Sequence, residues 1–499
     1  MAPSRPFTYC EGAPSWNPST YAADAALHER AEALLAQDNL QAAVAASFSL
    51  PPPRRDPYVY HAIVSVTLPE VQHVVSLGGR NGLHSWYRGP PPPSADDTTT
   101  TSSDNKPTPP LPLPSPLPVV LPPPPRPDTE AYLSIFDPTT STPAALKTFL
   151  SNAKKGSLRA EVAAYLHAKR YLHPSLAAQL TVPKRAAKKK KKKKKKEEEA
   201  STATSSSGNN DNSNNNNNNN AGNNNNNPNE VPPNPYLPFL SWSARALEWA
   251  GPCPSSARAG LTSHHVLPVL MHHFGCACPS HEALAVLKTL AAGRGVIDMG
   301  SGGGYWSFML RAYGVPCAAV DSAQSEWRVN WVSDTVIADG AEWLRRRRRV
   351  RAALVAGDKN ENDVDPEEAV LLLVYPIVGG DIAGGREGDF TRSMMDAYGG
   401  DTLAVVGTQN HNGYTGFRGM SMDEYVEREH GGGEEEGGWV KVVQVALPSF
   451  PGKDEALFVF QRGPRAPAKD PSSSTGAAGQ VSSIANSGGS SSSSNKGAT

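Results

Sequence analysis

Residues 295–322 place the strongest constraint on the fold of this 499-residue chain. Val296 and Ile297 are apolar and β-branched, which is typical of a buried strand. A glycine-rich turn follows at 300–304, and a second apolar run then ends on Asp321. Between them, apolar residues recur at helical spacing: Trp306, Met309, Leu310 and Tyr313. Strand, glycine turn, helix, strand and acid in this order predict a βαβ unit that binds a nucleotide or nucleoside.

The spacing of the glycines separates two classes of cofactor. A dinucleotide fold uses G-x-G-x-x-G, whose third glycine allows a helix to pack closely on a strand. Here that third position is Tyr305, whose ring does not fit the role. The spacing present is G-x-G-x-G, through Gly300, Gly302 and Gly304, with Asp298 just before it. This stretch resembles motif I of the class I S-adenosylmethionine-dependent methyltransferases.

The resemblance implies that S-adenosylmethionine is the cofactor and that Asp321 binds its ribose hydroxyls. Residues 335–344 resemble the third motif of the family, in which an acid reaches the adenine amino group, here Asp339. The alternative interpretation of Asp339 is an acid at a helix start, favoured by the helix dipole, and both interpretations can hold together. The cofactor-binding residues expected on this basis are Asp298, Gly300, Ser301, Gly302, Gly304, Tyr305, Asp321, Ser322, Asp339 and Gly340.

The later apolar runs predict the remaining strands of the same sheet. Residues 369–376 should lie beside the first strand, and 402–407 form the fifth strand. Residues 439–447 and 455–462 predict a closing antiparallel hairpin. We therefore expect an α/β fold with a Rossmann-like, seven-stranded, mostly parallel sheet over residues 235–463.

The acceptor side departs from the family pattern. Methyltransferases that act on amines often carry Asn-Pro-Pro-Tyr after the fourth strand, whereas this chain has Tyr-Pro-Ile-Val-Gly-Gly-Asp at 375–381. The chain looks closest to poorly characterised relatives that share Gly-Tyr-Trp after motif I. Tyr375, Asp381 and His411 are the catalytic candidates by position. The acceptor, a small molecule or a protein side chain, is not determined by these residues.

Low-complexity tracts divide the chain. With 43 glycines, 46 prolines and a hydrophobic content of only 38%, the packed mass is about one full domain and a smaller module. We expect a mainly helical N-terminal segment (1–88), a proline-rich linker (89–128), a helical segment (129–183), a disordered lysine- and asparagine-rich linker (184–234), the methyltransferase-like domain (235–463) and a disordered tail (464–499).

The charge distribution gives little support to a nucleic-acid partner. Residues 235–463 carry a net charge of −8, and Arg345–Arg349 lies beside an acidic loop, which favours a solvated surface. Only the lysine run at 188–196 offers a route to nucleic acid, or an import signal. The neighbouring asparagine run at 209–227 favours a solvated insertion instead.

Five cysteines in so long a chain do not form a disulfide framework, which indicates an intracellular protein, cytoplasmic or nuclear. No apolar run is long enough for a membrane span, and the start lacks the pattern of a secretory signal. The cluster of His272, His273, Cys276, Cys278 and His281 has poor spacing for zinc, so no metal is expected.

Three functions remain open at this point. The first is an active methyltransferase. The second is a cofactor-binding or scaffold protein that kept the fold and lost the activity. The third is an NAD-dependent oxidoreductase, which the glycine spacing and the closing hairpin disfavour. The oligomeric state is not determined by the sequence.

Overall fold

A mixed α/β sheet organises the described part of the chain. The computed structural model describes residues 7–62, 64–77, 125–180, 231–247, 251–252, 264–353, 364–376, 388–409, 420–431 and 438–467. Asp381, His411, most of the proline-rich stretch, the lysine and asparagine runs and the tail beyond 467 lie outside these ranges. Within them, no helix combines the length and the apolar character that crossing a membrane requires.

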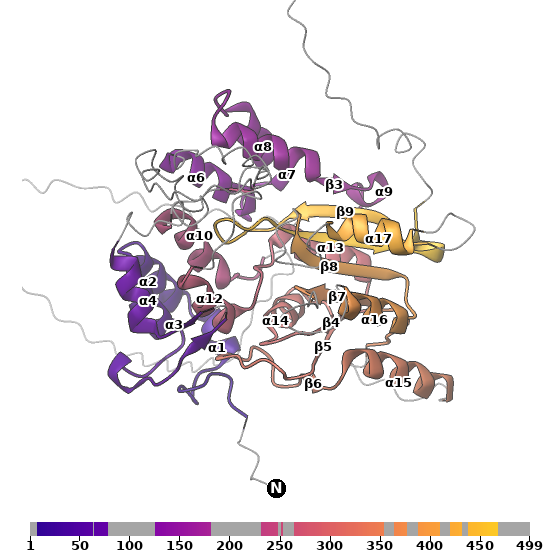
Figure 1. The fold of residues 1–499 in the computed structure, drawn as a ribbon, viewed down its shortest axis with the longest axis horizontal. Coiled ribbons are helices and arrows are strands. Elements are labelled where there is room, and N and C mark those ends of the chain that lie inside the picture. Colours follow the sequence, from indigo (N-terminus) through magenta and orange to yellow (C-terminus); the bar gives the residue numbers. More distant parts are fainter. Residues whose placement is uncertain are drawn as a thin grey trace, which may run out of the picture. The chain divides into compact units, whose positions relative to one another are not determined.

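Within the described ranges, the main sheet has eight strands in the order β3-β9-β10-β8-β7-β4-β5-β6 (Figure 1). Their bounds are β3 Tyr171–Leu172, β4 Val296–Met299, β5 Cys317–Asp321, β6 Val336–Ile337, β7 Val370–Val374, β8 Thr402–Thr408, β9 Val440–Ala446 and β10 Glu455–Gln461. Strands β4 to β8 are parallel to one another, and β10, β9 and β3 follow in antiparallel pairs. The predicted mostly parallel sheet with a closing antiparallel hairpin is therefore confirmed.

The chain changes direction across the sheet at β4. From β4 it proceeds outward to β5 and β6, and it then returns to the other side of β4 to form β7 and β8. As predicted, β7 pairs directly with β4, with Met299 opposite Leu373. In sheets of this kind a crevice for ligands opens at the carboxyl ends of the two strands where the order reverses.

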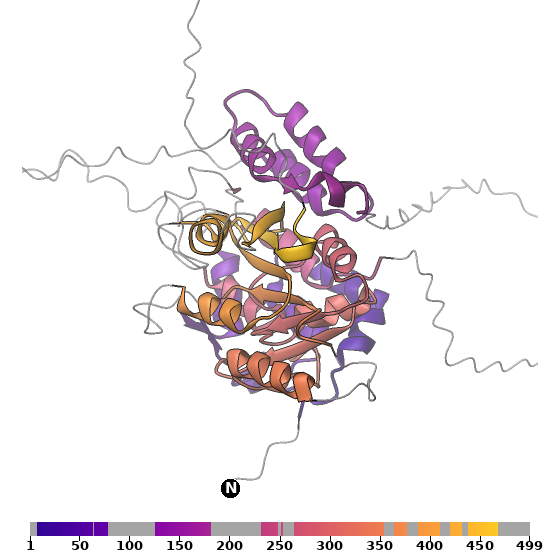
Figure 2. The same cartoon turned by 90° about the vertical axis from the view of Figure 1, so that its right-hand side faces the viewer.

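The sheet is buried on both faces, which explains the continuous apolar runs of its strands. Val296 and Leu372 point to a core that also contains α10 (Tyr236–Ala246), α12 (Val266–Phe274), α13 (His281–Ala291) and α14 (Tyr305–Ala312). Ile297 and Leu371 point to the opposite core, formed with α15 (Gly340–Ala353), α16 (Asp389–Ala397) and α17 (Met422–His430). Figure 2 shows α15 and α16 next to each other on that side of the sheet.

Strand β3 comes from a stretch for which the sequence predicted only helices. It follows α6 (Arg126–Leu133), α7 (Thr142–Ser151) and α8 (Leu158–Lys169), and it precedes the short helix α9 (Pro174–Ala177). Tyr171 and Leu172 pair with Gln444 and Val443 of β9. The sheet thus takes in one strand more than the seven that were predicted, and the added strand covers the outer edge of β9.

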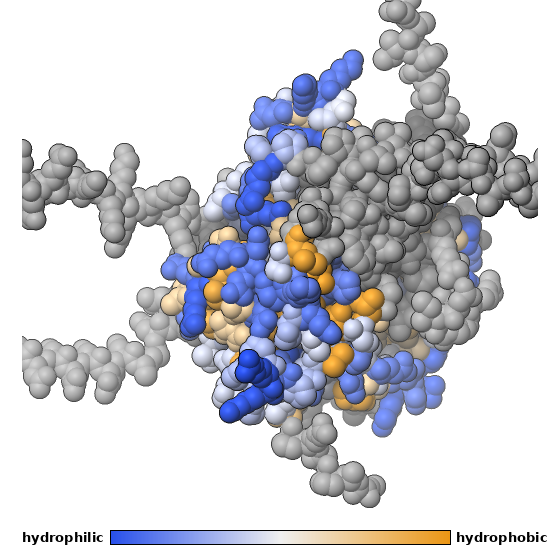
Figure 3. Space-filling model, turned by 60° about the vertical axis from the view of Figure 1, so that its left-hand side comes forward, coloured by the Kyte–Doolittle hydropathy of each residue, from blue (hydrophilic) through white to orange (hydrophobic). Residues whose placement is uncertain are grey.

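The N-terminal residues pack into the same core as α10 to α14. They form α1 (Pro18–Ala23), α2 (Ala25–Leu35), α3 (Leu40–Ser47), the small hairpin of β1 (Tyr60–His61) and β2 (Ser65–Val66), and α4 (Leu68–Ser76). On the side of α2 and α4, hydrophilic residues cover most of the described surface, with apolar residues in small patches between them (Figure 3), as is usual for a surface in water.

Arg328 ties this N-terminal part to the sheet domain. Its side chain is fully buried and lies 2.8 Å from the carboxylate of Asp56. It also donates a hydrogen bond to the Tyr60 hydroxyl at 2.7 Å, and its guanidinium lies 4.6 Å from the centre of the Tyr58 ring. Removing one member of such a buried ion pair leaves the other charge buried without compensation, which strongly destabilises the fold.

We predict that Arg328→Met lowers the free energy of unfolding of the full chain by about 3–5 kcal/mol, because it leaves the Asp56 carboxylate buried without its partner. Urea denaturation followed by circular dichroism measures this. The matched control is Arg465→Met, which breaks the more exposed ion pair with Asp401 and should change the value by about 1 kcal/mol at most. Equal losses in both variants would contradict the anchoring role of Arg328.

Candidate active site

The glycine loop between β4 and α14 has a backbone that only glycine adopts without strain. Gly300, Gly302 and Gly304 have φ angles of 75°, 55° and 77°, in the left-handed region. The amides of Gly300 and Ser301 donate to the Val320 carbonyl at the end of β5, at 2.7 and 3.1 Å. The G-x-G-x-G spacing therefore corresponds to three left-handed residues that fold the loop back onto the neighbouring strand.

Asp321, at the end of β5, is fixed against this loop. Its Oδ2 accepts a hydrogen bond from the Gly302 amide at 2.8 Å, and its Oδ1 accepts one from the Ala323 amide at 2.6 Å. Each carboxylate oxygen can accept a further hydrogen bond. The arrangement presents an oriented anionic acceptor at the carboxyl edge of the sheet, which suits a ligand with hydroxyl groups.

Asp298 lies on β4 beneath the loop and is 1% exposed. Its Oδ2 accepts a hydrogen bond from the Ser307 hydroxyl at 2.7 Å, while its Oδ1 has no partner among the described residues. Burial raises the pKa of Asp298 to about 6, against an ordinary value of 3.8. The carboxyl therefore changes between its neutral and charged forms near pH 6 instead of near pH 4.

The residues predicted after β5 and β6 lie at the same edge of the sheet. Ser322 directly follows β5 and is exposed. Asp339 is also exposed, and its Oδ1 accepts the Glu342 amide at 2.8 Å, so it caps the start of α15. Gly340 lies so close to Met299 that a Cβ atom there would overlap the Met299 sulfur. Close contact between α15 and β4 explains this glycine.

Tyr305 is engaged elsewhere. It begins α14 and is 2% exposed, and its ring packs against Tyr236, Phe274 and Trp331. Its hydroxyl donates to Asn234 Oδ1 at 2.6 Å and accepts the Tyr236 amide at 3.0 Å. The other residues that were predicted to bind the cofactor thus lie together at the carboxyl ends of β4 to β6. The hydroxyl of Tyr305 lies in the helical layer instead.

Tyr375 stands at the carboxyl end of β7, next to the glycine loop. Its φ angle of 52° is left-handed and unfavourable for a bulky side chain. Strain of this kind persists where the surroundings enforce it, often at functional sites. The Tyr375 amide donates to the Val406 carbonyl at 2.9 Å. Burial raises the pKa of the Tyr375 phenol well above 10, so the hydroxyl keeps its proton.

Two buried charged residues, which the sequence reasoning missed, complete this part of the site. The Tyr375 hydroxyl donates to Glu455 Oε1 at 2.7 Å and accepts from Lys453 Nζ at 3.2 Å. Lys453 and Glu455 are 5% and 2% exposed and lie 3.7 Å apart. The signal was present in the sequence, because Lys453, Asp454 and Glu455 lead directly into an apolar strand.

Several polar atoms near these residues are buried without a hydrogen-bond partner among the described residues. They are Glu455 Oε2, Asp454 Oδ1 and Gln409 Nε2. Glu455 pairs with Thr408 in the sheet, and the backbone N–H of Gln409 donates to the backbone carbonyl of Asp454. The three side chains therefore lie at the end of β8 and the start of β10. A buried polar atom without a partner needs an explanation, and a role in binding or catalysis is one. Of the other catalytic candidates, Asp381 and His411 lie outside the described residues.

The five residues considered for zinc have separate surroundings: His272 and His273 pack between α12 and the N-terminal part, His281 bonds to Tyr313, and Cys278 lies beside Asn234. His272 Nδ1 and the Tyr58 hydroxyl are 2.7 Å apart, and His273 Nε2 and the Tyr60 hydroxyl are 2.9 Å apart. Burial lowers the pKa of both imidazoles. Among the described residues, no group of three or more histidine, cysteine or acidic side chains has the geometry of a metal site.

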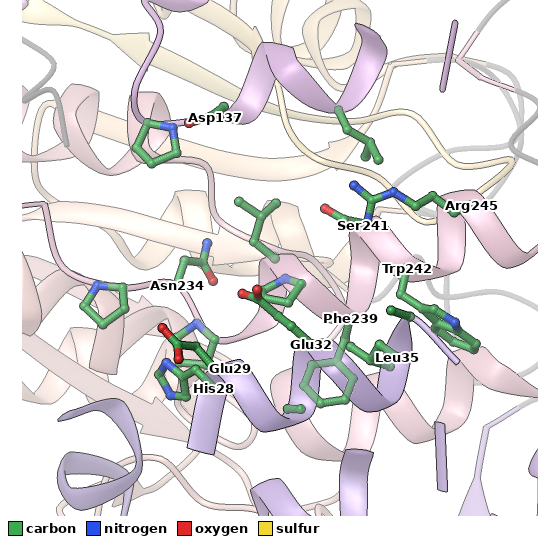
Figure 4. Close-up of a pocket in the computed structure, with 18 of the residues that line it drawn as sticks. His28, Glu29, Glu32, Leu35, Asp137, Asn234, Phe239, Ser241, Trp242 and Arg245 are labelled. Atoms are coloured by element: carbon green, nitrogen blue, oxygen red, sulfur yellow. The ribbon is translucent and has the colours of Figure 1, made fainter. Parts of the chain in front are cut away.

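A cavity of about 920 Å³ lies in the helical layer, between α1 and α2, α6 and α10 (Figure 4). Glu29 and Glu32 of α2, Asp137, and Trp242 and Arg245 of α10 contribute to its wall. None of the predicted cofactor-binding residues lines it. Asn234 links it to the start of α14, because its side chain lies in the wall and accepts the hydrogen bond from Tyr305.

No protein-family model and no curated protein matches the chain. In structure it is similar to a SAM-dependent methyltransferase from Agrobacterium tumefaciens, with 12% identity and a TM-score of 0.24 over 37% of this chain and 63% of that one, which is less than two thirds of its length. It is also similar to an rRNA methylase from Escherichia coli, with 12% identity and a TM-score of 0.19 over 36% of this chain and 71% of that one. Similarity at this level leaves the function to be argued from the chain's own residues.

We predict that the stability difference between the wild type and Asp298→Asn depends on pH. Because burial raises the pKa to about 6, the native protein retains a proton that the unfolded chain releases above about pH 4. The wild type should therefore lose about 3 kcal/mol relative to the variant as the pH rises from about 4 to above 6. Urea unfolding at several pH values measures this, and a difference that stays constant would contradict the raised pKa.

Proposed function

We propose that the chain binds S-adenosylmethionine at the carboxyl ends of β4, β5 and β6 and transfers its methyl group to a small molecule or a protein side chain. The observation that carries the proposal is the Asp321 carboxylate, held by the Gly302 amide within a G-x-G-x-G loop where the strand order reverses. A ligand crevice is expected at that position, and the carboxylate suits ribose hydroxyls.

The residues at this edge fit a nucleoside-containing methyl donor. Three glycines keep the loop free of side chains, and Asp339 lies one strand beyond Asp321, suited to an adenine amino group. Ser301 Oγ and Trp327 Nε1 are buried at the loop without partners among the described residues, and both can donate hydrogen bonds. We leave Tyr305 out of the donor contacts, because Asn234 and Tyr236 already occupy its hydroxyl.

Methyl transfer places modest demands on acid–base chemistry. When bound, S-adenosylmethionine supplies a methyl group activated by a positively charged sulfur. The chain's task is to orient the acceptor in line with that methyl and to exclude water. Tyr375 and Lys453, at the end of β7 and before β10, can position the acceptor by hydrogen bonds. The partnerless oxygen of Glu455 can take up a proton that a hydroxyl or amine acceptor releases.

We predict that the full chain binds S-adenosylhomocysteine and that Asp321→Ala weakens this binding at least about tenfold, because hydrogen bonds to a charged acceptor are lost. Isothermal titration calorimetry measures both affinities. Asp334→Ala is the matched control, since its carboxylate is exposed and pairs with Arg311 instead. Absence of binding by the wild type would refute the proposed function, and an unchanged affinity in Asp321→Ala would refute the role of that residue. Titration with NAD in the same experiment tests the oxidoreductase alternative.

We predict that Glu455→Gln leaves the affinity for S-adenosylhomocysteine within about twofold and lowers methyl transfer at least about a hundredfold, the scale of general-base catalysis. Transfer of label from S-adenosylmethionine to fractions of a cell extract measures the activity. Equal transfer by the variant would contradict the role of Glu455. If the wild type binds the donor and labels no fraction, the scaffold alternative is favoured instead.

A further inference from the structure

The segment between β5 and β6 lies directly on the glycine loop. We call residues 327–332 the donor strap. The Trp331 amide donates to the Gly303 carbonyl at 2.6 Å. A Cβ atom at Gly303 would lie 2.5 Å from the Val329 carbonyl oxygen, and one at Gly304 would lie 2.5 Å from a Val332 methyl carbon. The backbone of the loop therefore packs directly against the donor strap. This packing is possible because Gly303 and Gly304 have no side chain.

The other side of the donor strap is held by the N-terminal part of the chain. The Asn330 amide donates to the Tyr9 carbonyl at 2.7 Å, and the Glu11 amide donates to the Arg328 carbonyl at 2.8 Å. The buried Arg328 side chain adds the ion pair with Asp56. Because the donor strap is fixed from both sides, its first residue, Trp327, has a defined position relative to the loop.

Trp327 turns the nitrogen edge of its ring to Gly302. A Cβ atom at Gly302 would lie 2.9 Å from Trp327 Cζ2, 3.0 Å from Cε2 and 3.2 Å from Nε1. Gly302 is also the residue whose amide bonds to the Asp321 carboxylate. The indole and the carboxylate thus contact the same glycine, and a ligand whose hydroxyls bind Asp321 comes next to the indole.

The indole nitrogen has no other use in the described structure. Trp327 Nε1 is buried and has no hydrogen-bond partner among the described residues. A buried donor without a partner is destabilising, and an indole N–H can only donate. The group that satisfies it must be a hydrogen-bond acceptor, which a purine nucleoside offers in its ring nitrogens and its sugar oxygens.

We propose that Trp327 is a specificity-determining residue for the nucleoside part of the methyl donor, with its indole N–H donating to an acceptor atom of that nucleoside. The assignment rests on the proposed function, because it takes the Asp321 edge as the donor site. The donor site then depends on two parts of the chain, because contacts from residues 9–56 fix the donor strap that carries Trp327.

The test compares two probes, S-adenosylhomocysteine and adenosine, by calorimetry on the full chain. Trp327→Phe retains an aromatic ring and removes the N–H, and it should weaken both probes by the same factor, roughly three- to tenfold. Trp439→Phe is the matched control, because Trp439 stacks on Tyr398 and lies over Arg462 in the opposite core. The control should bind both probes as the wild type does.

A second measurement uses the wild type, so that it does not depend on the folding of a variant. The indole N–H resonance of Trp327, assigned in the wild type by its through-bond and through-space correlations, should shift when S-adenosylhomocysteine is added. An unshifted resonance, or an affinity in Trp327→Phe that is unchanged or tighter, overturns the assignment. A loss for S-adenosylhomocysteine without a loss for adenosine overturns the nucleoside contact. If the wild type binds neither probe, the donor site itself is refuted, which is a different result from a failure of the variant alone.

Discussion

The hydrogen bond from the Gly302 amide to the Asp321 carboxylate is the contact on which the candidate site depends. It joins the turn after β4 to the end of β5, and it forms because Gly302 has a left-handed backbone that aims its amide at the neighbouring strand. A side chain at this position would meet the Trp327 ring as well as strain the backbone. Gly302 therefore orients the Asp321 carboxylate through its amide and leaves room for the Trp327 ring. The geometry of this edge of the sheet depends on that one residue.

The same edge depends on residues far away in the sequence. Asp56 and Tyr60 bury the Arg328 guanidinium, and Arg328 lies in the donor strap that covers the loop. Because Arg328 and Asp56 are both buried, removing either one would leave the other as an uncompensated charge and lower the stability of the fold. This dependence also matters for experiments, because a fragment limited to the sheet domain would expose Arg328 and release one wall of the donor site.

The local pattern of apolar residues predicted the strands of the sheet. It did not predict features that depend on contacts between residues distant in the sequence. The buried strands were predictable because both faces of a parallel sheet are apolar. The apolar residues of 58–77 have spacings that do not distinguish a helix from a strand, and the structure shows a hairpin followed by α4, which starts with a capping box between Thr67 and Glu70. The position of Trp327 had no local signature, and the charged residues Lys453 and Glu455 were visible beside an apolar strand, but their burial depends on segments that only the fold brings together.

Buried polar atoms without a partner among the described residues occur on both sides of the candidate site. On the donor side, two backbone amides hold Asp321, whereas Asp298 Oδ1, Ser301 Oγ and Trp327 Nε1 have no described partner. On the acceptor side, Glu455, Asp454 and Gln409 keep buried polar atoms without described partners, beside a strained Tyr375. Folding alone gives no reason to bury such groups, because apolar residues of similar size would be at least as stable. Because the sequence at 375–381 leaves the family motif on the acceptor side, we expect the chemistry that distinguishes this chain at the ends of β7, β8 and β10.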